Sequence, residues 1–126
     1  MSYSKPELES VSKVIDRATI RRYAKVTDDF NPIHLDPEFA ARTPMGGIIA
    51  HGMLSLNLIW QSLRKTYGPG AAEGACLDVR FIHPVREDDT VRAGGRAKSD
   101  AAGVYDVTVE NQKGVIVISG TLTLNK

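Results

Sequence analysis

Asp29 and His34 lie five residues apart, separated by the turn-forming pair Asn31-Pro32. Carboxylates and imidazoles are among the side chains most often used for proton transfer, and an Asn-Pro turn can bend the chain so that both face one small volume. Such a pair can hold one water molecule and add it across a double bond conjugated to a carbonyl, because that water supplies both the hydroxyl and the proton. We therefore take Asp29 and His34 as the candidate catalytic pair.

A second segment, His51-Gly52, directly precedes a strongly apolar stretch. Addition of water to a conjugated carbonyl creates an enolate oxygen, which backbone N–H groups at the start of a helix are suited to stabilise. Glycine also lets a substrate carbonyl approach the backbone closely. Gly52 is therefore the candidate oxyanion-binding residue.

The same residues also have structural interpretations, and their spacing alone leaves both kinds open. An aspartate near Asn-Pro often forms only an Asx turn, and His34 fits a hydrogen-bonded structural role. His51 at a helix start is typical of a loop anchor. Asp28 fits a solvated neighbour of the pair, and Asp36 fits a helix cap.

The sequence offers little support for a metal site. His34, Asp36 and His51 are the residues of the right type, but their spacing matches no common ligand template, so no metal is expected. The single cysteine, Cys76, excludes an intrachain disulfide and a cysteine-based zinc site. It lies in an alternating, strand-like stretch, which predicts a small buried residue.

Length and composition favour one ordinary globular domain spanning residues 1–126. The net charge of +1 gives no reason to expect nucleic acid or a membrane surface as a partner. The sequence begins without an apolar signal core, and no apolar run reaches the roughly 18 residues needed to span a bilayer. We therefore expect a cytoplasmic location.

The hydrophobic pattern predicts an α+β fold. Helices are expected over residues 16–26, 36–42 and 51–67, with Asp16 as the cap of the first and Asp36 as the cap of the second. The last is apolar nearly all round, so we expect it to be buried, with Met53 and Trp60 on its buried face. Five strands with short connections, which favour antiparallel pairing, are expected near residues 11–15, 74–83, 90–97, 104–110 and 115–124.

Three segments together resemble one family. Residues 23–36 resemble the hydratase motif of the MaoC-like, (R)-specific enoyl-CoA hydratases and dehydratases, and residues 48–54 resemble the second signature of that family. Residues 81–85 are similar to a strand of the family that ends in Pro-Val. The three segments stand in the family's order and span most of the chain.

The resemblance implies a hot-dog fold, in which a curved antiparallel sheet wraps around one long helix, usually in a homodimer. It implies Asp29 and His34 as the catalytic pair, Asn31 as a residue that holds the loop, and Gly52 N–H as the donor to the thioester oxygen, with His51 beside it. The implied reaction interconverts 2-enoyl and (R)-3-hydroxyacyl thioesters, as in fatty acid metabolism. The carrier is coenzyme A or acyl carrier protein, and no metal or redox cofactor is implied.

Two rival functions remain on the same fold. One is an acyl thioesterase, and the other is a non-catalytic module that binds acyl thioesters. One residue also departs from the family pattern, because Asp28 stands where the family commonly has glycine. A second carboxylate there could repel the charge of Asp29, point away into solvent, or require a backbone angle that glycine tolerates better.

Overall fold

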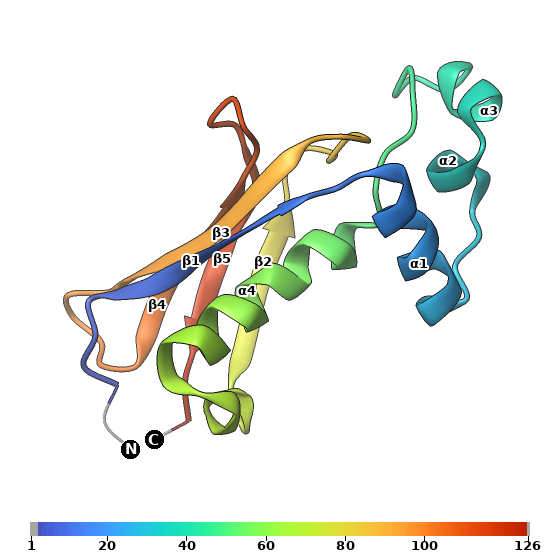
Figure 1. Cartoon of the computed structure of the whole chain (residues 1–126). Coiled ribbons are helices and arrows are strands. Elements are labelled where there is room, and N and C mark those ends of the chain that lie inside the picture. Colours follow the sequence, from blue (N-terminus) through green and yellow to red (C-terminus); the bar gives the residue numbers. More distant parts are fainter. Residues whose placement is uncertain (1–2, 126) are drawn as a thin grey trace.

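The computed structural model describes residues 3–125. Its elements are β1 (Glu7–Val14), α1 (Arg17–Thr27), α2 (Pro32–Leu35), α3 (Pro37–Ala41), α4 (Gly52–Tyr67), a 3-10 turn (Pro69–Ala72), β2 (Cys76–Phe81), β3 (Thr90–Ala97), β4 (Val104–Glu110) and β5 (Ile116–Thr123). The strands form one antiparallel sheet in the order β1-β3-β4-β5-β2. The sheet curves along α4, and α1, α2 and α3 lie beyond one end of it (Figure 1).

The predicted α+β architecture is confirmed, including the long helix and the five strands. The first strand is longer than expected and begins at Glu7 rather than near Val11. It pairs with β3 through a register shift between Leu8 and Val11, where a bulge interrupts its polar and apolar alternation. That interruption is the reason why the sequence pattern located only the second half of the strand.

The core lies between α4 and the inner face of the sheet. The central strand β4 buries Tyr105, Val107 and Val109, and α4 buries Leu58 and Leu63 against them. The Tyr105 hydroxyl donates a hydrogen bond of 2.6 Å to Lys5 O and is paired with the Tyr67 hydroxyl. Burial raises the pKa of Tyr105, and the Tyr67 partner raises it further.

Two predictions of burial are wrong. Met53 is 51% exposed because the sheet covers only one side of α4 in this chain. Cys76 is exposed because it opens β2, and β2 is the last strand of the sheet. Trp60 is half-buried and packs against the core. Both exposed positions therefore lie on the side of the fold where the sheet stops.

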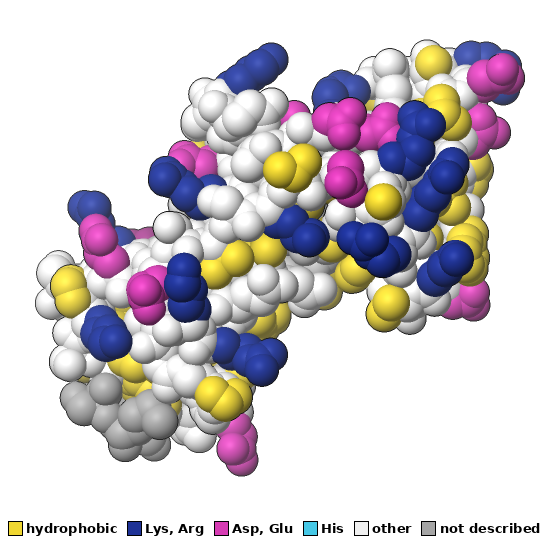
Figure 2. Space-filling model, viewed as in Figure 1, with side chains coloured by type: hydrophobic (Ala, Val, Ile, Leu, Met, Phe, Trp, Pro, Cys, Tyr) yellow, Lys and Arg dark blue, Asp and Glu magenta, His cyan; other side chains and the backbone are white. Residues whose placement is uncertain are grey.

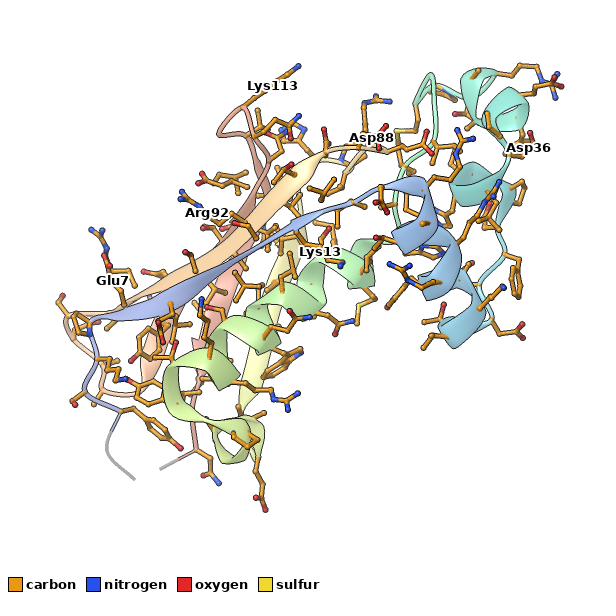
Figure 3. The ribbon with its side chains drawn as sticks, viewed as in Figure 1. Glu7, Lys13, Asp36, Asp88, Arg92 and Lys113 are labelled. Atoms are coloured by element: carbon orange, nitrogen blue, oxygen red, sulfur yellow. The ribbon has the colours of Figure 1, made fainter. Side chains whose placement is uncertain are left out.

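Polar contacts fix the small helices to the sheet. Asp16 caps α1 by accepting from Thr19 N at 2.8 Å, and Arg17 pairs with Glu87 before β3 at 2.6 Å. The hydrogen bond from the Arg17 guanidinium holds the pKa of the Glu87 carboxyl below its ordinary value. Asp36 lies where α2 meets α3 (Figure 3) and caps α3, as the sequence predicted. These contacts fix the start of α1 and the start of α3, and the candidate site lies between these two helices.

The surface carries both signs of charge. Lys and Arg side chains gather over α1, but Asp and Glu side chains flank them on the face shown in Figure 2. On the outer side of the sheet, Arg92 of β3 is paired with Glu110 of β4. Within residues 3–125, no helix combines the length and the apolar character needed to cross a membrane.

Candidate active site

The site begins where α1 ends. Asp28 adopts a left-handed conformation, with φ of 56°, and its N–H donates to Ala24 O. The N–H of Asp29 donates to the same carbonyl at 3.1 Å. This left-handed residue turns the chain sharply out of the helix and presents Asp29, whose Oδ1 accepts from Asn31 N at 3.3 Å.

The segment after Asp29 is a single helical turn rather than the simple turn that Asn-Pro suggests. Asn31 is the N-cap of α2, since its Oδ1 accepts from Ile33 N at 3.1 Å, and Pro32 occupies the first helical position. Proline is tolerated there because its missing N–H would have no helical partner. The turn brings His34 back toward Asp29. Asn31 therefore binds its own backbone neighbour Ile33 at the start of this turn.

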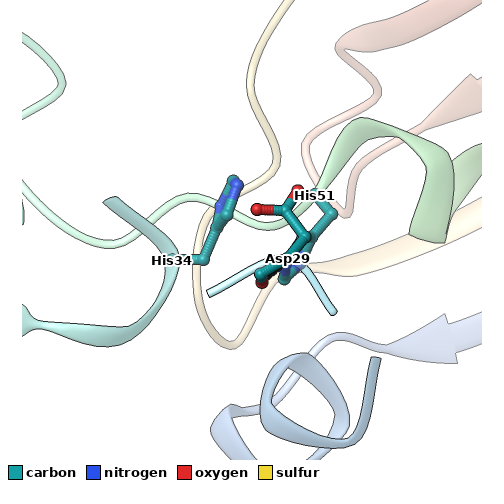
Figure 4. Close-up of side chains that lie close together, drawn as sticks. All are labelled: Asp29, His34 and His51. Carbon is teal, nitrogen blue, oxygen red and sulfur yellow. Dashed lines mark hydrogen bonds between the residues drawn. The ribbon is translucent and has the colours of Figure 1, made fainter. Parts of the chain in front are cut away.

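Asp29, His34 and His51 lie together, although His51 comes from a distant part of the sequence (Figure 4). One ligand atom of each side chain lies within 4.8 Å of the corresponding atoms of the other two. The His34 Nδ1 is 2.7 Å from Ile49 O, so the tautomer that donates from Nδ1 satisfies this contact. That tautomer leaves the lone pair on Nε2 free to accept a proton.

His51 is buried and contacts both members of the pair. Its Nε2 is 3.0 Å from the backbone oxygen of Asp29, and its ring stacks on His34 with a centroid distance of 3.8 Å. Tyr23 closes the other side of the ring in an edge contact at 5.1 Å. These contacts fit the anchoring interpretation of His51, because the side chain is directed at the loop that carries Asp29.

The geometry of this cluster does not favour a metal ion. Asp36, one of the three residues considered from the sequence, is instead used to cap α3 through Glu38 N and Phe39 N. The three residues whose ligand atoms do lie close together are His34, His51 and, in place of Asp36, Asp29. However, the His34 and His51 rings are stacked with an interplanar angle of 26°, so their in-plane lone pairs run side by side and do not converge on one point.

Gly52 begins α4, and no side chain caps this helix. The N–H of Leu54 donates to His51 O, which leaves the N–H groups of Gly52 and Met53 available to an incoming oxygen. A Cβ on residue 52 would lie 2.9 Å from Phe81 Cε1, so the ring and the helix start approach closely only because residue 52 is glycine. A cavity of about 270 Å³ opens beside Gly52, between residues 45–50 and residues 81–85.

The cavity and the Asp29/His34 pair share one stretch of chain. Ile49 and Gly52 line the cavity, while Ile49 O accepts from His34 and the His51 ring contacts Asp29. Asp29 and His34 themselves do not line the cavity in this single chain. Residues 49–52 therefore hold the candidate acid/base pair against a compartment large enough for part of a small substrate.

Two participants in this arrangement were missed by the sequence analysis. One is the backbone oxygen of Ile49, which no side-chain motif can reveal. The other is Ser55, whose side chain is fully buried on the cavity wall and has no hydrogen-bond partner. A serine inside an apolar helix carries no spacing signal, because small residues are common in buried helices.

A curved antiparallel sheet on one long helix, with an Asp/His pair beside the start of that helix, defines a hot-dog-fold domain. The family described as "MaoC like domain" matches residues 3–120. The chain therefore belongs to the MaoC-like family, as its motifs indicated.

Named relatives and a solved structure show what the chain is similar to. It is 42% identical over 84 residues to the 3-hydroxybutyryl-CoA dehydratase of Methylorubrum extorquens, covering 66% of this chain and 53% of that protein. It is 38% identical over 85 residues to the (R)-specific enoyl-CoA hydratase of Rhodospirillum rubrum, covering 67% and 58%. These matches span little more than half the length of either relative. An unliganded R-hydratase from Pseudomonas aeruginosa superposes with a TM-score of 0.81 at 28% identity, over 94% of this chain and 77% of that one.

The conformation of Asp28 leads to a prediction about stability. Replacing Asp28 with glycine is expected to raise the free energy of unfolding by about 0.5–1 kcal/mol, because glycine adopts positive φ without a steric cost and a carboxylate is removed from the C-terminal end of α1. Asp28→Ala is the matched control and should lower stability, since it keeps a Cβ at φ of 56°. Urea unfolding of the three proteins measures both changes, and a glycine variant no more stable than the alanine variant contradicts the account.

Proposed function

We propose that this protein hydrates 2-enoyl thioesters to (R)-3-hydroxyacyl thioesters and catalyses the reverse dehydration. The proposal is supported above all by the juxtaposition of Asp29 and His34, with the His34 ring held by Ile49 O so that Nε2 is free. Membership of the MaoC-like family and the named hydratase and dehydratase relatives support it independently.

The proposed step uses one water molecule held between the two side chains. Two acceptors that each lie about 2.8 Å from one water, along its two O–H bonds, are roughly 4.6 Å apart. The ligand atoms of the cluster lie within 4.8 Å of one another, an upper bound that is compatible with such a bridging water. In hydration, the pair accepts one proton as the water oxygen bonds to the β-carbon, and the same proton is then delivered to the α-carbon. Both added atoms come from the water, so the reaction as written needs no metal or redox cofactor.

The electrons of the double bond pass to the thioester oxygen during the addition. In this proposal Gly52 N–H, at the uncapped start of α4, donates to that oxygen and stabilises the enolate. Asn31 and His51 act indirectly. Asn31 shapes the turn that carries His34, and His51 holds the backbone of Asp29.

The decisive experiment follows the loss of the enoyl absorbance with a panel of short and medium 2-enoyl-CoA thioesters, while a second assay measures free thiol. We expect loss of the enoyl band without thiol release, and formation of the (R)-alcohol on chiral analysis. Thiol release without hydration would instead identify a thioesterase. Tight binding of the thioesters with neither reaction would identify a binding module.

We further propose that the active unit is a homodimer and that the carrier-bound acyl thioester is its partner in solution. β2 ends the sheet with an unpaired edge, and large apolar side chains are exposed beside it: Met53, Phe81 and Ile82. Unpaired edges and exposed apolar side chains in one place are features that proteins normally cover. A second copy of the chain would cover both and would close the exposed side of α4.

Light scattering during gel filtration tests the dimer. One chain has a mass of 13.7 kDa, and the wild-type protein is expected to elute at twice that mass. Ile82→Lys should shift the mass toward that of one chain, because a charge would be buried at the interface without a partner. The matched control Val115→Lys changes an exposed residue in the turn that precedes β5 and should leave the mass unchanged. A wild-type mass equal to one chain contradicts the proposal.

A further inference from the structure

Two buried side-chain atoms in residues 3–125 lack a hydrogen-bond partner, and both flank the start of α4. They are His51 Nδ1 and Ser55 Oγ. Buried polar groups are nearly always hydrogen-bonded, because an unpaired one keeps the cost of leaving water without compensation. Their occurrence on either side of Gly52, at a helix end that no side chain caps, indicates a place where a ligand completes the hydrogen bonding.

Of the two atoms, Ser55 Oγ is the better suited to bind a ligand, both because a hydroxyl can donate a hydrogen bond and because of its position on α4. Residue 55 is one helical turn beyond Gly52, so the two residues share a face of α4. Both residues line the same cavity. Its other walls are mainly apolar side chains, including Ile49, Val85 and Ile118. Ser55 and His83 are thus the only polar side chains among the described residues that line this cavity, and Ser55 is the one on the first turns of α4, close to their N–H groups.

We propose that the Ser55 hydroxyl is a second hydrogen-bond donor to the thioester oxygen, acting beside Gly52 N–H. This inference rests on the proposed function for the identity of the ligand. The hydroxyl is buried, and in a buried environment a hydrogen bond to a developing negative charge is stronger than in solution. When the thioester carbonyl enters the cavity, the unpaired hydroxyl gains an acceptor. The hydrogen bond becomes stronger as the thioester oxygen acquires the negative charge of the enolate.

Loss of the Ser55 hydroxyl should affect the rate of hydration but not the stability of the protein. Removal of a hydroxyl that has no partner in the free protein should cost no stability, so Ser55→Ala should keep or slightly raise the melting temperature. The same change should lower kcat for hydration about tenfold with little change in KM, since the bond strengthens in the transition state.

Ser62→Ala is the matched control on the same helix. Ser62 is as deeply buried, but its hydroxyl donates to Glu9 O, far from the cavity. Its loss should lower the melting temperature and leave kcat unchanged. The two variants therefore predict opposite patterns: Ser55→Ala affects the rate but not the melting temperature, and Ser62→Ala affects the melting temperature but not the rate.

A spectroscopic measurement makes the test independent of turnover. In an Asp29→Asn background, a bound 2,4-dienoyl-CoA should absorb at longer wavelength than the free thioester, because donors to its carbonyl oxygen polarise the conjugated system. The red shift should be smaller when Ser55→Ala is added and unchanged when Ser62→Ala is added. A shift that is the same with and without Ser55, or absent in both, overturns the proposal.

Failure of the wild-type protein to hydrate any enoyl thioester would overturn the proposed function instead, and the shift would still decide whether Ser55 contacts the carbonyl.

Discussion

Asp29→Asn is expected to lower kcat/KM for the hydration of an enoyl-CoA thioester by about a thousandfold, within the range typical of losing a general acid or base. The substitution keeps the size of the side chain and an oxygen that can accept from Asn31 N. It removes the charge that would take a proton from water. Because the backbone oxygen of Asp29 still accepts from His51, the fold and the melting temperature should be nearly unchanged.

His34→Ala and the double variant test whether the two residues act on one water. His34→Ala should reduce the rate by a similar factor. The double variant should be little slower than the slower single variant, since losses are not additive when two residues serve one step. Asp28→Asn is the control, because asparagine tolerates the left-handed conformation and the neighbouring carboxylate has no part in the proposed step. Rate losses that multiply in the double variant would show that the residues act separately.

The sequence predicted the parts of this protein that depend on local pattern. Asp16 and Asp36 are helix caps as expected, and the alternation of polar and apolar residues located β3 and β4 at their observed bounds. These features depend on interactions between residues that are close together in the chain, so a short stretch of sequence is enough to predict them. The Asp29/His34 pair is local in the same sense, since one turn of α2 is enough to bring the two side chains together.

Other features depend on contacts between distant segments, which a pattern cannot supply. Met53 and Cys76 were expected to be buried, but Met53 lies on a side of α4 that the sheet does not cover, and Cys76 opens the last strand of the sheet, β2. Of the three consequences considered for Asp28, the structure confirms the backbone angle, since its positive φ is the conformation that glycine favours. Ser55 gave no signal, because its significance comes from a missing partner and only three-dimensional coordinates reveal that.

His51→Ala is expected to lower kcat about a hundredfold, the largest effect of any residue outside the proposed acid/base pair, although His51 makes no proton transfer in the proposed mechanism. Its ring separates Tyr23 from His34, and its Nε2 holds the backbone oxygen of Asp29. Loss of the ring leaves that oxygen without its partner and opens a cavity behind the pair. Misplacement by about 1 Å is enough to cost a factor of this size. We also expect the free energy of unfolding to fall by about 3 kcal/mol.

Two further variants separate positioning from simple loss of stability. His51→Phe keeps the ring against His34 but cannot donate to Asp29 O, so it should recover most of the stability and little of the rate. Thr66→Val is the control at the far end of α4, where the Thr66 hydroxyl accepts from Glu9 N at 2.9 Å. It should lower the melting temperature and leave kcat unchanged. If kcat instead followed the melting temperature across all three variants, His51 would be a residue of the core only, and the order of the Asp29 loop would not depend on its hydrogen bond.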